Sequence, residues 1–431
     1  MPLRTCAQLW AGPAAGIEAS ETALASRLHN ISVRSGLDLR VVVVGGSLGG
    51  LTAALVLRDL GADVEVYERS RKPLEGLGAG IVLHPATVRY VAERSDHDVT
   101  ELSSRASRLR YLDGDGRVVH EGPCRFRFTS YRTLYRALLD CFDRRRYHLG
   151  MRVEDFDCDG DGVTVKVDGG PVERCDVLVC ADGIHSSARR RLLPEVKPRY
   201  SGYVGWRGTV AEASQPELLA TLRDAITYFV MPSSHILAYP IPAPGTSPQD
   251  GEALTNWVWY RNVAADPDLH ELLTDREGKR HEVSLPPGLV QPRHVEELRG
   301  VASERLPPVL RMVVRDTVDP FVQAVFDIEV PRMAFGRVCL IGDAAFALRP
   351  HAAAGTAKAA ADAWALGEAL QAAGGDVAAA LEHWERRQLA VGRRVFQRTR
   401  DAGERSQFEN TWPVGAPLPF GLYETGDSEL P

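Results

Sequence analysis

Mostly apolar runs of four to six residues occur at three places in the chain, at 39–44, 176–181 and 338–341. This pattern is typical of strands that are buried on both faces of a parallel sheet. After the first run, an Ala/Leu-rich segment at 51–59 predicts a helix, and 63–68 predicts a second strand. The order is that of a βαβ unit, so we expect a Rossmann-like domain with a parallel sheet.

A different pattern fills the middle of the chain. Residues 200–210, 225–231, 236–241 and 254–263 alternate or run as β-type segments between loops rich in Pro, Gly and Ser. Such segments predict a mostly antiparallel sheet. We therefore expect an α/β (α+β) chain in which this second sheet forms a separate part.

The patterns predict a division of the chain. The expected parts are a poorly ordered N-terminal extension at 1–37, a discontinuous nucleotide-binding domain at 38–199 and 300–375, a substrate domain at 200–299, and a C-terminal helix and tail at 376–431. Two helices are expected near the end of the chain, at 359–372 before Gly374-Gly375 and in the Arg-rich segment 384–400.

The turn after the first strand, Gly-Gly-Ser-Leu-Gly-Gly at 45–50, predicts a site for a pyrophosphate. Glycines allow the phosphate to approach a helix N-terminus, where free N–H groups and the helix dipole favour anions. Glu68 ends the next strand, where a carboxylate can accept from ribose hydroxyls. A glycine-rich turn of another α/β protein is the alternative. The candidate cofactor-binding residues here are Gly45, Gly46, Ser47, Leu48, Gly49, Gly50, Glu68 and Arg69.

An Asp-Gly or Gly-Asp pair follows each of the other two apolar runs. An aspartate at the carboxyl edge of the sheet can bond a ribityl hydroxyl of a nucleotide bound there, although an Asx turn is the alternative. The helix predicted at 359–372, after Gly355-Thr356-Ala357, offers N–H groups and a positive dipole to the pyrimidine end of a flavin. Together these features indicate FAD. The candidates are Asp182, Gly183, Gly342, Asp343, Ala354, Gly355, Thr356 and Ala357.

These motifs resemble the single-component FAD-dependent aromatic hydroxylases related to para-hydroxybenzoate hydroxylase. Further segments that share the resemblance are 66–70, 80–82, 127–131, 202–208, 238–242, 349–355 and 420–422. The resemblance implies non-covalent FAD, NADH or NADPH as a transient co-substrate, and dioxygen. It implies hydroxylation of a small, electron-rich aromatic or N-heteroaromatic ring, phenolic or pyridine-diol-like, through a flavin hydroperoxide. It also implies that Arg132 lies against the cofactor and that Pro350 turns its carbonyl toward the flavin or substrate.

Removal of a proton from a ring hydroxyl suits a base whose pKa lies near neutrality. The candidates are His235 and His351, with His84 as a third, and each could instead be structural. Aromatic residues of the predicted strands could stack on the ring, although core packing is the alternative because strands alternate their faces. These candidates are Trp206, Tyr228, Tyr239 and Trp259.

Composition narrows the classes further. A chain of 431 residues with 44% hydrophobic residues can bury a large core, and a net charge of −6 does not suggest nucleic acid. Seven cysteines without Cys-x-x-Cys or metal-like spacing favour a reducing cytoplasm and no metal site. No apolar stretch reaches the roughly eighteen residues of a membrane span. A homodimer is one assembly that the sequence allows.

Other functions stay open at this level. Flavin-dependent halogenases carry Trp-x-Trp-x-Ile-Pro, which residues 257–262 do not match, and a second Gly-x-Gly-x-x-Gly after a strand is absent from the sequence. An epoxidase, a decarboxylative hydroxylase, a halogenase-like enzyme and a non-catalytic flavin-binding sensor or scaffold remain as alternatives. Turnover of NAD(P)H triggered by a substrate would separate an enzyme from a sensor.

Overall fold

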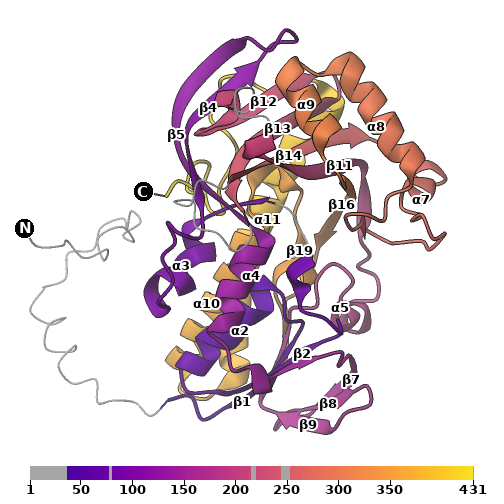
Figure 1. Cartoon of the computed structure of the whole chain (residues 1–431). Helices are drawn as coiled ribbons and strands as arrows, with labels where there is room; N and C mark the ends of the chain where they lie inside the picture. Colours follow the sequence, from indigo (N-terminus) through magenta and orange to yellow (C-terminus); the bar gives the residue numbers. More distant parts are fainter. Residues whose placement is uncertain (1–35, 77–79, 215–219, 244–252, 431) are drawn as a thin grey trace, which may run out of the picture. The chain divides into compact units, whose positions relative to one another are not determined.

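The computed structural model describes residues 36–76, 80–214, 220–243 and 253–430 (Figure 1). All of them except Gly36 belong to the unit Leu37–Pro431. The expected N-terminal extension lies almost wholly outside the described residues. Among the described helices, none is both long and apolar enough to cross a membrane.

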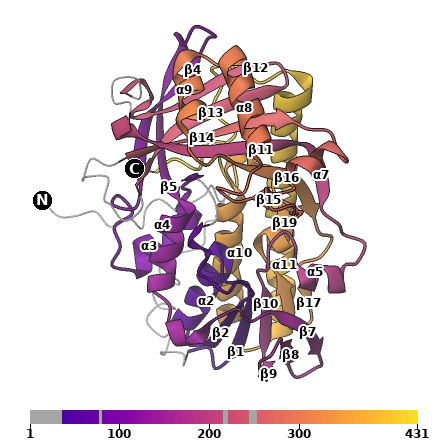
Figure 2. The same cartoon turned by 45° about the vertical axis from the view of Figure 1, so that its right-hand side comes forward.

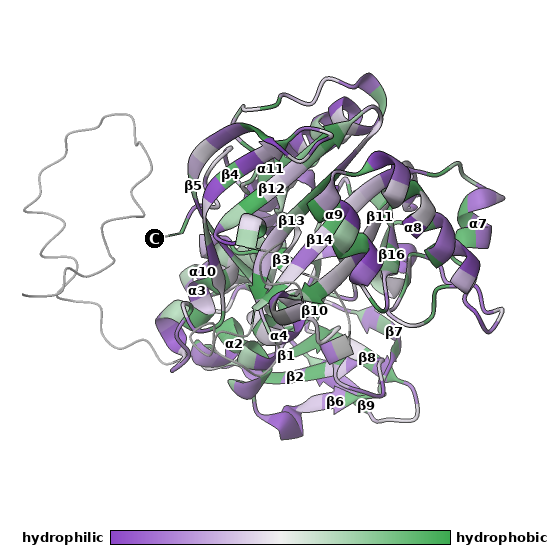
Figure 3. Cartoon of the chain, turned by 45° about the horizontal axis from the view of Figure 1, so that its top comes forward, coloured by the Kyte–Doolittle hydropathy of each residue, from purple (hydrophilic) through white to green (hydrophobic). Residues whose placement is uncertain are grey.

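A six-stranded sheet contains the apolar runs of the sequence. Its strands, in spatial order, are β17 (Ala334–Phe335), β18 (Val338–Leu340), β10 (Val177–Cys180), β1 (Arg40–Val44), β2 (Asp63–Glu68) and β6 (Tyr147–Leu149). All neighbours pair in parallel except β17 and β18. The predicted parallel sheet is therefore confirmed, and its central strands are green, that is hydrophobic, in Figure 3.

Helices cover this sheet. They are α2 (Leu48–Asp59), α3 (Pro85–Arg94), α4 (Tyr131–Asp140), α5 (Ser187–Leu192), α10 (Gly355–Ala373) and α11 (Val377–Glu404). Helix α10 packs closely on α2 because Gly49 has no side chain, and a Cβ there would lie 2.9 Å from Cβ of Ala359. The expected helix at 359–372 begins earlier, at Gly355, after Ala353 adopts a left-handed φ of 52°.

The second sheet has ten strands and is mostly antiparallel, as predicted. They are β3 (Gly80–Val82), β4 (Ser104–Leu112), β5 (Val118–Ser130), β11 (Arg199–Ala211), β12 (Ala225–Met231), β13 (Ser234–Pro242), β14 (Ala253–Asn262), β15 (Ser284–Leu285), β16 (Phe321–Glu329) and β19 (Phe346–Ala347). Within this sheet, β12 and β4 are the only described strands that pair in parallel. Strands from 80–130 join it, so the sheet extends beyond the range 200–299, and the division into domains stays a prediction.

The two faces of the ten-stranded sheet have different neighbours. One face, with Trp206, Trp257 and Trp259, packs in a core with α8 (Pro292–Arg305) and α9 (Pro308–Asp316). These two helices lie in front of β11–β14 in Figure 2. The other face belongs to a separate core rich in tyrosine, and the alternation of side chains along each strand decides which residue joins which core.

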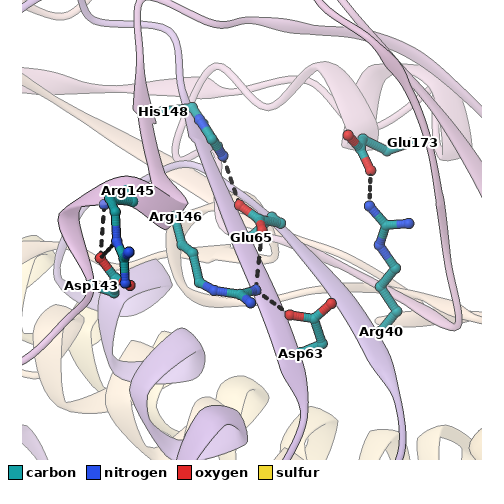
Figure 4. A network of polar contacts seen from close by, with 8 residues as sticks. All are labelled: Arg40, Asp63, Glu65, Asp143, Arg145, Arg146, His148 and Glu173. Atoms are coloured by element: carbon teal, nitrogen blue, oxygen red, sulfur yellow. Dashed lines mark hydrogen bonds and ion pairs between the residues drawn. The ribbon is translucent and has the colours of Figure 1, made fainter.

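The edge of the parallel sheet is joined to its neighbours by charged side chains (Figure 4). Arg146 bonds to Asp63 and Glu65 of β2, and Nε2 of His148 lies 2.7 Å from Oε2 of Glu65. A small sheet of β7 (Val153–Cys158), β8 (Val163–Val167) and β9 (Val172–Cys175) follows β6 in the chain. The ion pairs of Arg146 and His148 are partly exposed, so each stabilises the fold only slightly.

Helix α11 continues into a π-helix, Arg405–Glu409, and ends at Asn410, whose φ of 58° is left-handed. Residues 410–430, called the C-terminal tail below, then run back across the larger sheet to β5. The backbone N–H of Leu430 donates to the carbonyl of Arg125 at 2.9 Å. The predicted helix at 384–400 lies inside α11 and is confirmed.

Candidate active site

A cavity of about 790 Å³ lies between the carboxyl edge of the parallel sheet and the tyrosine-rich face of the larger sheet. Its lining includes the turn after β1, the end of β2, the turn after β10, and the beginning of α10. Ligands of open α/β sheets bind at the carboxyl ends of strands, where the loops leave room and free N–H groups. This cavity therefore contains the candidate site.

The turn after β1 requires its glycines. Gly45 has a φ of 95°, and a Cβ there would lie 2.4 Å from the carbonyl oxygen of Ala181. A Cβ on Gly50 would lie 1.9 Å from the carbonyl oxygen of Gly45. Gly45, Ser47, Leu48 and Gly49 line the cavity, whereas Gly46 and Gly50 are placed behind this surface.

Glu68 holds the same turn in place. Its Oε2 accepts a hydrogen bond from the N–H of Gly46 at 2.9 Å, and its Oε1 accepts from Ser70 at 2.8 Å. The side chain is buried but borders the cavity, as does the exposed Arg69 beside it. Glu68 thus supports the turn and still offers lone pairs to a bound ribose.

Asp182 presents an oxygen that lacks a partner. Its Oδ2 accepts from the N–H of Ser187 at 2.7 Å, whereas its Oδ1 is buried with no hydrogen-bond donor among the described residues. Asp182 and Gly183 both line the cavity. A hydroxyl or N–H of a nucleotide cofactor would satisfy this oxygen, so the donor set fits FAD.

Asp343 points its carboxylate into the cavity. The side chain is open to solvent where it borders the cavity and is surrounded by protein atoms on its other sides. These protein atoms partly desolvate the carboxylate and raise the pKa of Asp343 to about 6, although the charge of Arg189 lowers it. The turn is fixed from behind, since the N–H of Gly342 donates to Oδ2 of Asp362 at 3.0 Å. Asp362 itself forms a fully buried ion pair with Lys358.

The beginning of α10 faces the cavity through Ala354, Gly355 and Thr356, whereas Ala357 is buried in the core. Pro350, just before it, also lines the cavity. Arg349 anchors this loop because its guanidinium binds Asp327 of β16 at 2.9 Å and Glu404 of α11 at 3.0 Å.

Some expected site residues are not brought to the cavity. Arg132 lies on α4, where its side chain is 40% exposed and 3.6 Å from Glu75. Trp206 and Trp259 face the opposite side of the larger sheet, where they are buried. Nε1 of Trp259 donates to Oγ of Ser234 at 2.9 Å, so its polar group is satisfied in that core.

Tyr228 and Tyr239 do line the cavity, on the same face of the sheet as Tyr260. Arg207 joins them from β11, and its Nε is buried without a partner among the described residues. The positive charge of Arg207 lowers the pKa of Tyr239 and of Tyr260, although burial, the larger effect, raises both. This end of the cavity combines flat aromatic walls with one cation.

His235 and His351 meet at this aromatic end, with ring centroids 5.4 Å apart. Nε2 of His351 shares a hydrogen bond of 2.8 Å with the hydroxyl of Tyr203, and Nδ1 of His235 bonds to Oγ of Ser406. Burial lowers the pKa of His235 to about 3, and burial, His235 and Arg349 lower the pKa of His351 well below its usual value. Both imidazoles are therefore neutral at pH 7.

His84, the third candidate base, does not line the cavity. It caps helix α3, because its Nδ1 accepts from the N–H of Ala86 at 3.0 Å. Its Nε2 lies 3.1 Å from Asp427 of the C-terminal tail. Both nitrogens are thus engaged in structural contacts.

The predicted set did not include several residues that line the cavity, among them Arg207, Tyr260, Trp412 and Phe420. For two of them a signal existed, since Tyr260 and Arg207 alternate with Trp259 and Trp206 on their strands. Choosing one face for the site would have excluded the tryptophans. The tail carries no regular pattern, and its one segment with a family resemblance, 420–422, includes Phe420 but not Trp412.

A Rossmann-like sheet with this glycine turn, and a second sheet that closes over its carboxyl edge, define an FAD-dependent oxidoreductase. The matching family models are an FAD binding domain-like model at 200–327, an FAD binding domain at 325–399, and a pyridine nucleotide-disulphide oxidoreductase model at 40–82.

The chain is 38% identical over 386 residues to 2,6-dihydroxypyridine 3-monooxygenase of Paenarthrobacter nicotinovorans, covering 89% of this chain and 96% of that protein. The solved structure of 2,6-dihydroxypyridine-3-hydroxylase from Arthrobacter nicotinovorans matches with a TM-score of 0.85 and 37% identity, covering 91% and 98% of the two chains. Klebsiella pneumoniae HpxO complexed with FAD and uric acid matches with a TM-score of 0.68 and 25% identity, covering 86% and 90%.

The chain therefore belongs to the FAD-dependent aromatic hydroxylases related to para-hydroxybenzoate hydroxylase. It is a flavoprotein monooxygenase with FAD as its cofactor, and the predicted fold, cofactor and enzyme class are confirmed. An aromatic substrate, NAD(P)H and dioxygen are the reactants consistent with this family.

Proposed function

We propose that the chain hydroxylates a small, hydroxylated N-heteroaromatic ring of the dihydroxypyridine kind. The relative with 38% identity carries a name that specifies such a ring. The aromatic end of the cavity is compatible with it, since Tyr228, Tyr239 and Tyr260 offer flat surfaces for a planar ligand. The observation that carries the proposal is Arg207, the one cation among the described residues that line this end, near two neutral imidazoles.

The charges around this end of the cavity favour a ligand with one negative charge. Arg207 has no ion pair among the described residues, so an ionised ring oxygen would meet a cation without displacing a carboxylate. A ring with several carboxylates would leave charges unmatched at high cost. An acidic ring hydroxyl therefore suits this end best, and its ionisation makes the ring carbon more electron-rich.

The imidazoles would handle the proton. His351 keeps a buried Nδ1 without a partner among the described residues while its Nε2 is engaged with Tyr203. A neutral ring in this position can accept a hydrogen bond from a ring hydroxyl and orient it. Bound FAD supplies the redox chemistry by which NAD(P)H activates dioxygen. The chain's own part is to orient the ring and to exclude water.

The FAD-holding residues are part of the same proposal. We assign the pyrophosphate to the N–H groups at 47–50, because those of Gly45 and Gly46 donate to Tyr67 and Glu68. We assign the ribose to Glu68, and ribityl contacts to Asp182 and Asp343. The pyrimidine end would meet the N–H groups at the beginning of α10, near Gly355. We propose that NADH or NADPH binds transiently rather than stably. We also propose that the protein acts in the cytoplasm as a homodimer, and light scattering tests the oligomeric state.

The test is a panel of ring compounds added to the FAD-loaded enzyme with NADH or NADPH. The panel contains dihydroxypyridines, monohydroxypyridines, phenols and benzene dicarboxylates, and the readouts are NAD(P)H oxidation and the product mass. We expect dihydroxypyridines to stimulate oxidation most and to gain one oxygen atom. Stimulation confined to dicarboxylates, or oxidation without any oxygenated product from the panel, contradicts the proposal.

A further inference from the structure

We propose that the C-terminal tail completes the substrate site and that Trp412 is a specificity-determining residue that contacts the substrate ring. The inference deepens the proposed function, on which it rests for the class of ring. Trp412 and Phe420 both line the cavity, at the end that contains Tyr228, His235 and His351. They are the part of the lining that lies farthest along the chain from the nucleotide turn.

Trp412 forms an ordered stack with the residues of this end. Its ring lies 4.9 Å from the ring of His235 with an interplanar angle of 27°, and 6.0 Å from Tyr228 with an angle of 23°. His351 is 6.2 Å away. Its Nε1 donates to the hydroxyl of Tyr111 at 3.4 Å. The indole is thus fixed in orientation and only partly buried, which leaves surface for a ligand.

The tail is tied to the loop that contains His351. The N–H of Gly421 donates to the carbonyl of Ala352 at 3.0 Å, next to His351. Leu422 is 1% exposed and packs with Ala352 and Ala354, at the beginning of α10. Arg398 of α11 donates to carbonyls of the tail, including that of Leu422 at 3.2 Å. A displaced tail would therefore disturb both walls of the site.

Asp427 closes the turn that carries these contacts. Its carboxylate accepts from the N–H groups of Leu422 and Tyr423, both at 2.8 Å, and from Glu424 at 3.0 Å. Because Nδ1 of His84 accepts from a backbone N–H, a ring proton is on Nε2, which donates to Asp427. Burial pushes the pKa of Asp427 up, but these hydrogen bonds outweigh it and hold that pKa below its usual value.

Gly421 is required by this turn. Its φ is 143°, and a Cβ there would lie 1.9 Å from the carbonyl oxygen of Glu424. A substitution at Gly421 therefore moves the tail without removing the Trp412 ring. The tail can be tested by two independent changes, one that deletes the indole and one that loosens its support.

The first test compares Trp412→Ala with Trp412→Phe, using the FAD-loaded full chain and 2,6-dihydroxypyridine as probe. We expect Trp412→Ala to raise the Kd of the probe, measured by the change in flavin absorbance, about tenfold, the size of one lost aromatic contact. Trp412→Phe should recover most of this loss, FAD affinity should be unchanged, and bulkier bicyclic rings should gain affinity in Trp412→Ala. Trp364→Phe, beneath Arg89 and not part of the cavity lining, is the matched control.

The second test uses Gly421→Ala and Asp427→Asn, with Glu429→Gln as the control in a partly exposed ion pair with Arg125. The first two should weaken the probe and release more hydrogen peroxide per NAD(P)H oxidised, because water reaches the site; the control should do neither. An unchanged Kd in both Trp412→Ala and Gly421→Ala overturns the inference. A wild-type enzyme that binds no ring of the panel overturns the proposed function, and the inference with it.

Discussion

The carboxyl edge of the parallel sheet and the inner face of the ten-stranded sheet form one cavity in different ways. At the sheet edge, the backbone forms the surface of the site. Glycines at 45 and 50 allow close approach, and the first N–H groups of α2 have no acceptor within the helix. On the larger sheet, side chains from strands far apart in sequence make the surface, with Arg207, Tyr239 and Tyr260 from three strands. A backbone site tolerates few substitutions, whereas a side-chain site can change its ligand by single replacements.

The largest effect is expected at the backbone site. Gly50→Val would place side-chain atoms where the carbonyl of Gly45 lies, so the turn must open. We expect a loss of at least about 3 kcal/mol in FAD binding, a weakening of more than a hundredfold, measured by flavin fluorescence titration. Gly114→Ala, where a Cβ meets no atom within 4 Å, is the control. Tight FAD binding by Gly50→Val would mean that the turn is not the cradle.

A loss of similar size should appear at the side-chain site, but in a different step. His351→Gln removes the imidazole beside Tyr203, and we expect hydroxylation to fall about a hundredfold, the lower end for a lost acid–base group. Flavin reduction by NAD(P)H and FAD affinity should stay near wild type. Rapid-mixing spectroscopy separates the two half-reactions. Equal losses in flavin reduction and in hydroxylation would mean that the two regions do not act in separate steps. The same two measurements on His235→Gln test the second imidazole.

Asp343 combines features of both regions, because its side chain is the group expected to bind FAD, but it lies in the turn at the edge of the parallel sheet. Asp343→Asn should weaken FAD roughly 10- to 100-fold by removing a charge-assisted bond of about 1.5–3 kcal/mol. Unchanged FAD affinity would show that the aspartate serves only the turn.

The pH dependence gives a second measurement on Asp343. The pKa is raised to about 6 without cofactor, so FAD binding to the ionised carboxylate should weaken as the pH falls through 6. The folding contribution has the opposite sign: stability from this group is present below the unfolded pKa, near 4, and is lost as the pH rises to about 6. Cofactor-free Asp343→Asn should therefore melt higher than wild type at pH 7. A lower melting temperature would contradict this.

The smallest effects separate the two faces of one strand. Trp259→Phe should lower the free energy of unfolding by about 1–3 kcal/mol through lost packing and the bond to Ser234, with an unchanged KM for the ring. Tyr260→Phe should change stability little and raise this KM a few fold. Denaturant melts and steady-state kinetics check both. A raised KM for Trp259→Phe alone would reverse the assignment of faces.

The difference between the regions also explains what the sequence could predict. Gly45, Glu68 and Asp343 line the cavity at the sheet edge, as turns and strand ends follow from local pattern, and their contacts with FAD stay a prediction. Arg132 is placed against the cofactor by resemblance alone; its side chain lies 3.6 Å from Glu75, and its contact with the cofactor stays a prediction.

The larger sheet was found, but its register was not. The four aromatic candidates included both Tyr239 and Trp259, which the pleat places on opposite faces. Which face meets the ligand depends on α8 and α9 covering the other, a contact that alternation alone cannot show. Trp412 lies in an irregular segment whose position depends on Asp427 and His84, so no local signal could predict it.

The bond between His84 and Asp427 also has a kinetic consequence, because it joins positions 343 residues apart in the chain. Contacts of such separation form late when a chain refolds, since the ordering of the intervening segments must come first. During refolding from denaturant, native sheet structure should therefore return before the ring-binding end of the cavity is closed. Stopped-flow measurements that follow the far-ultraviolet signal and ring binding in parallel would reveal two phases, with ring binding in the slower one.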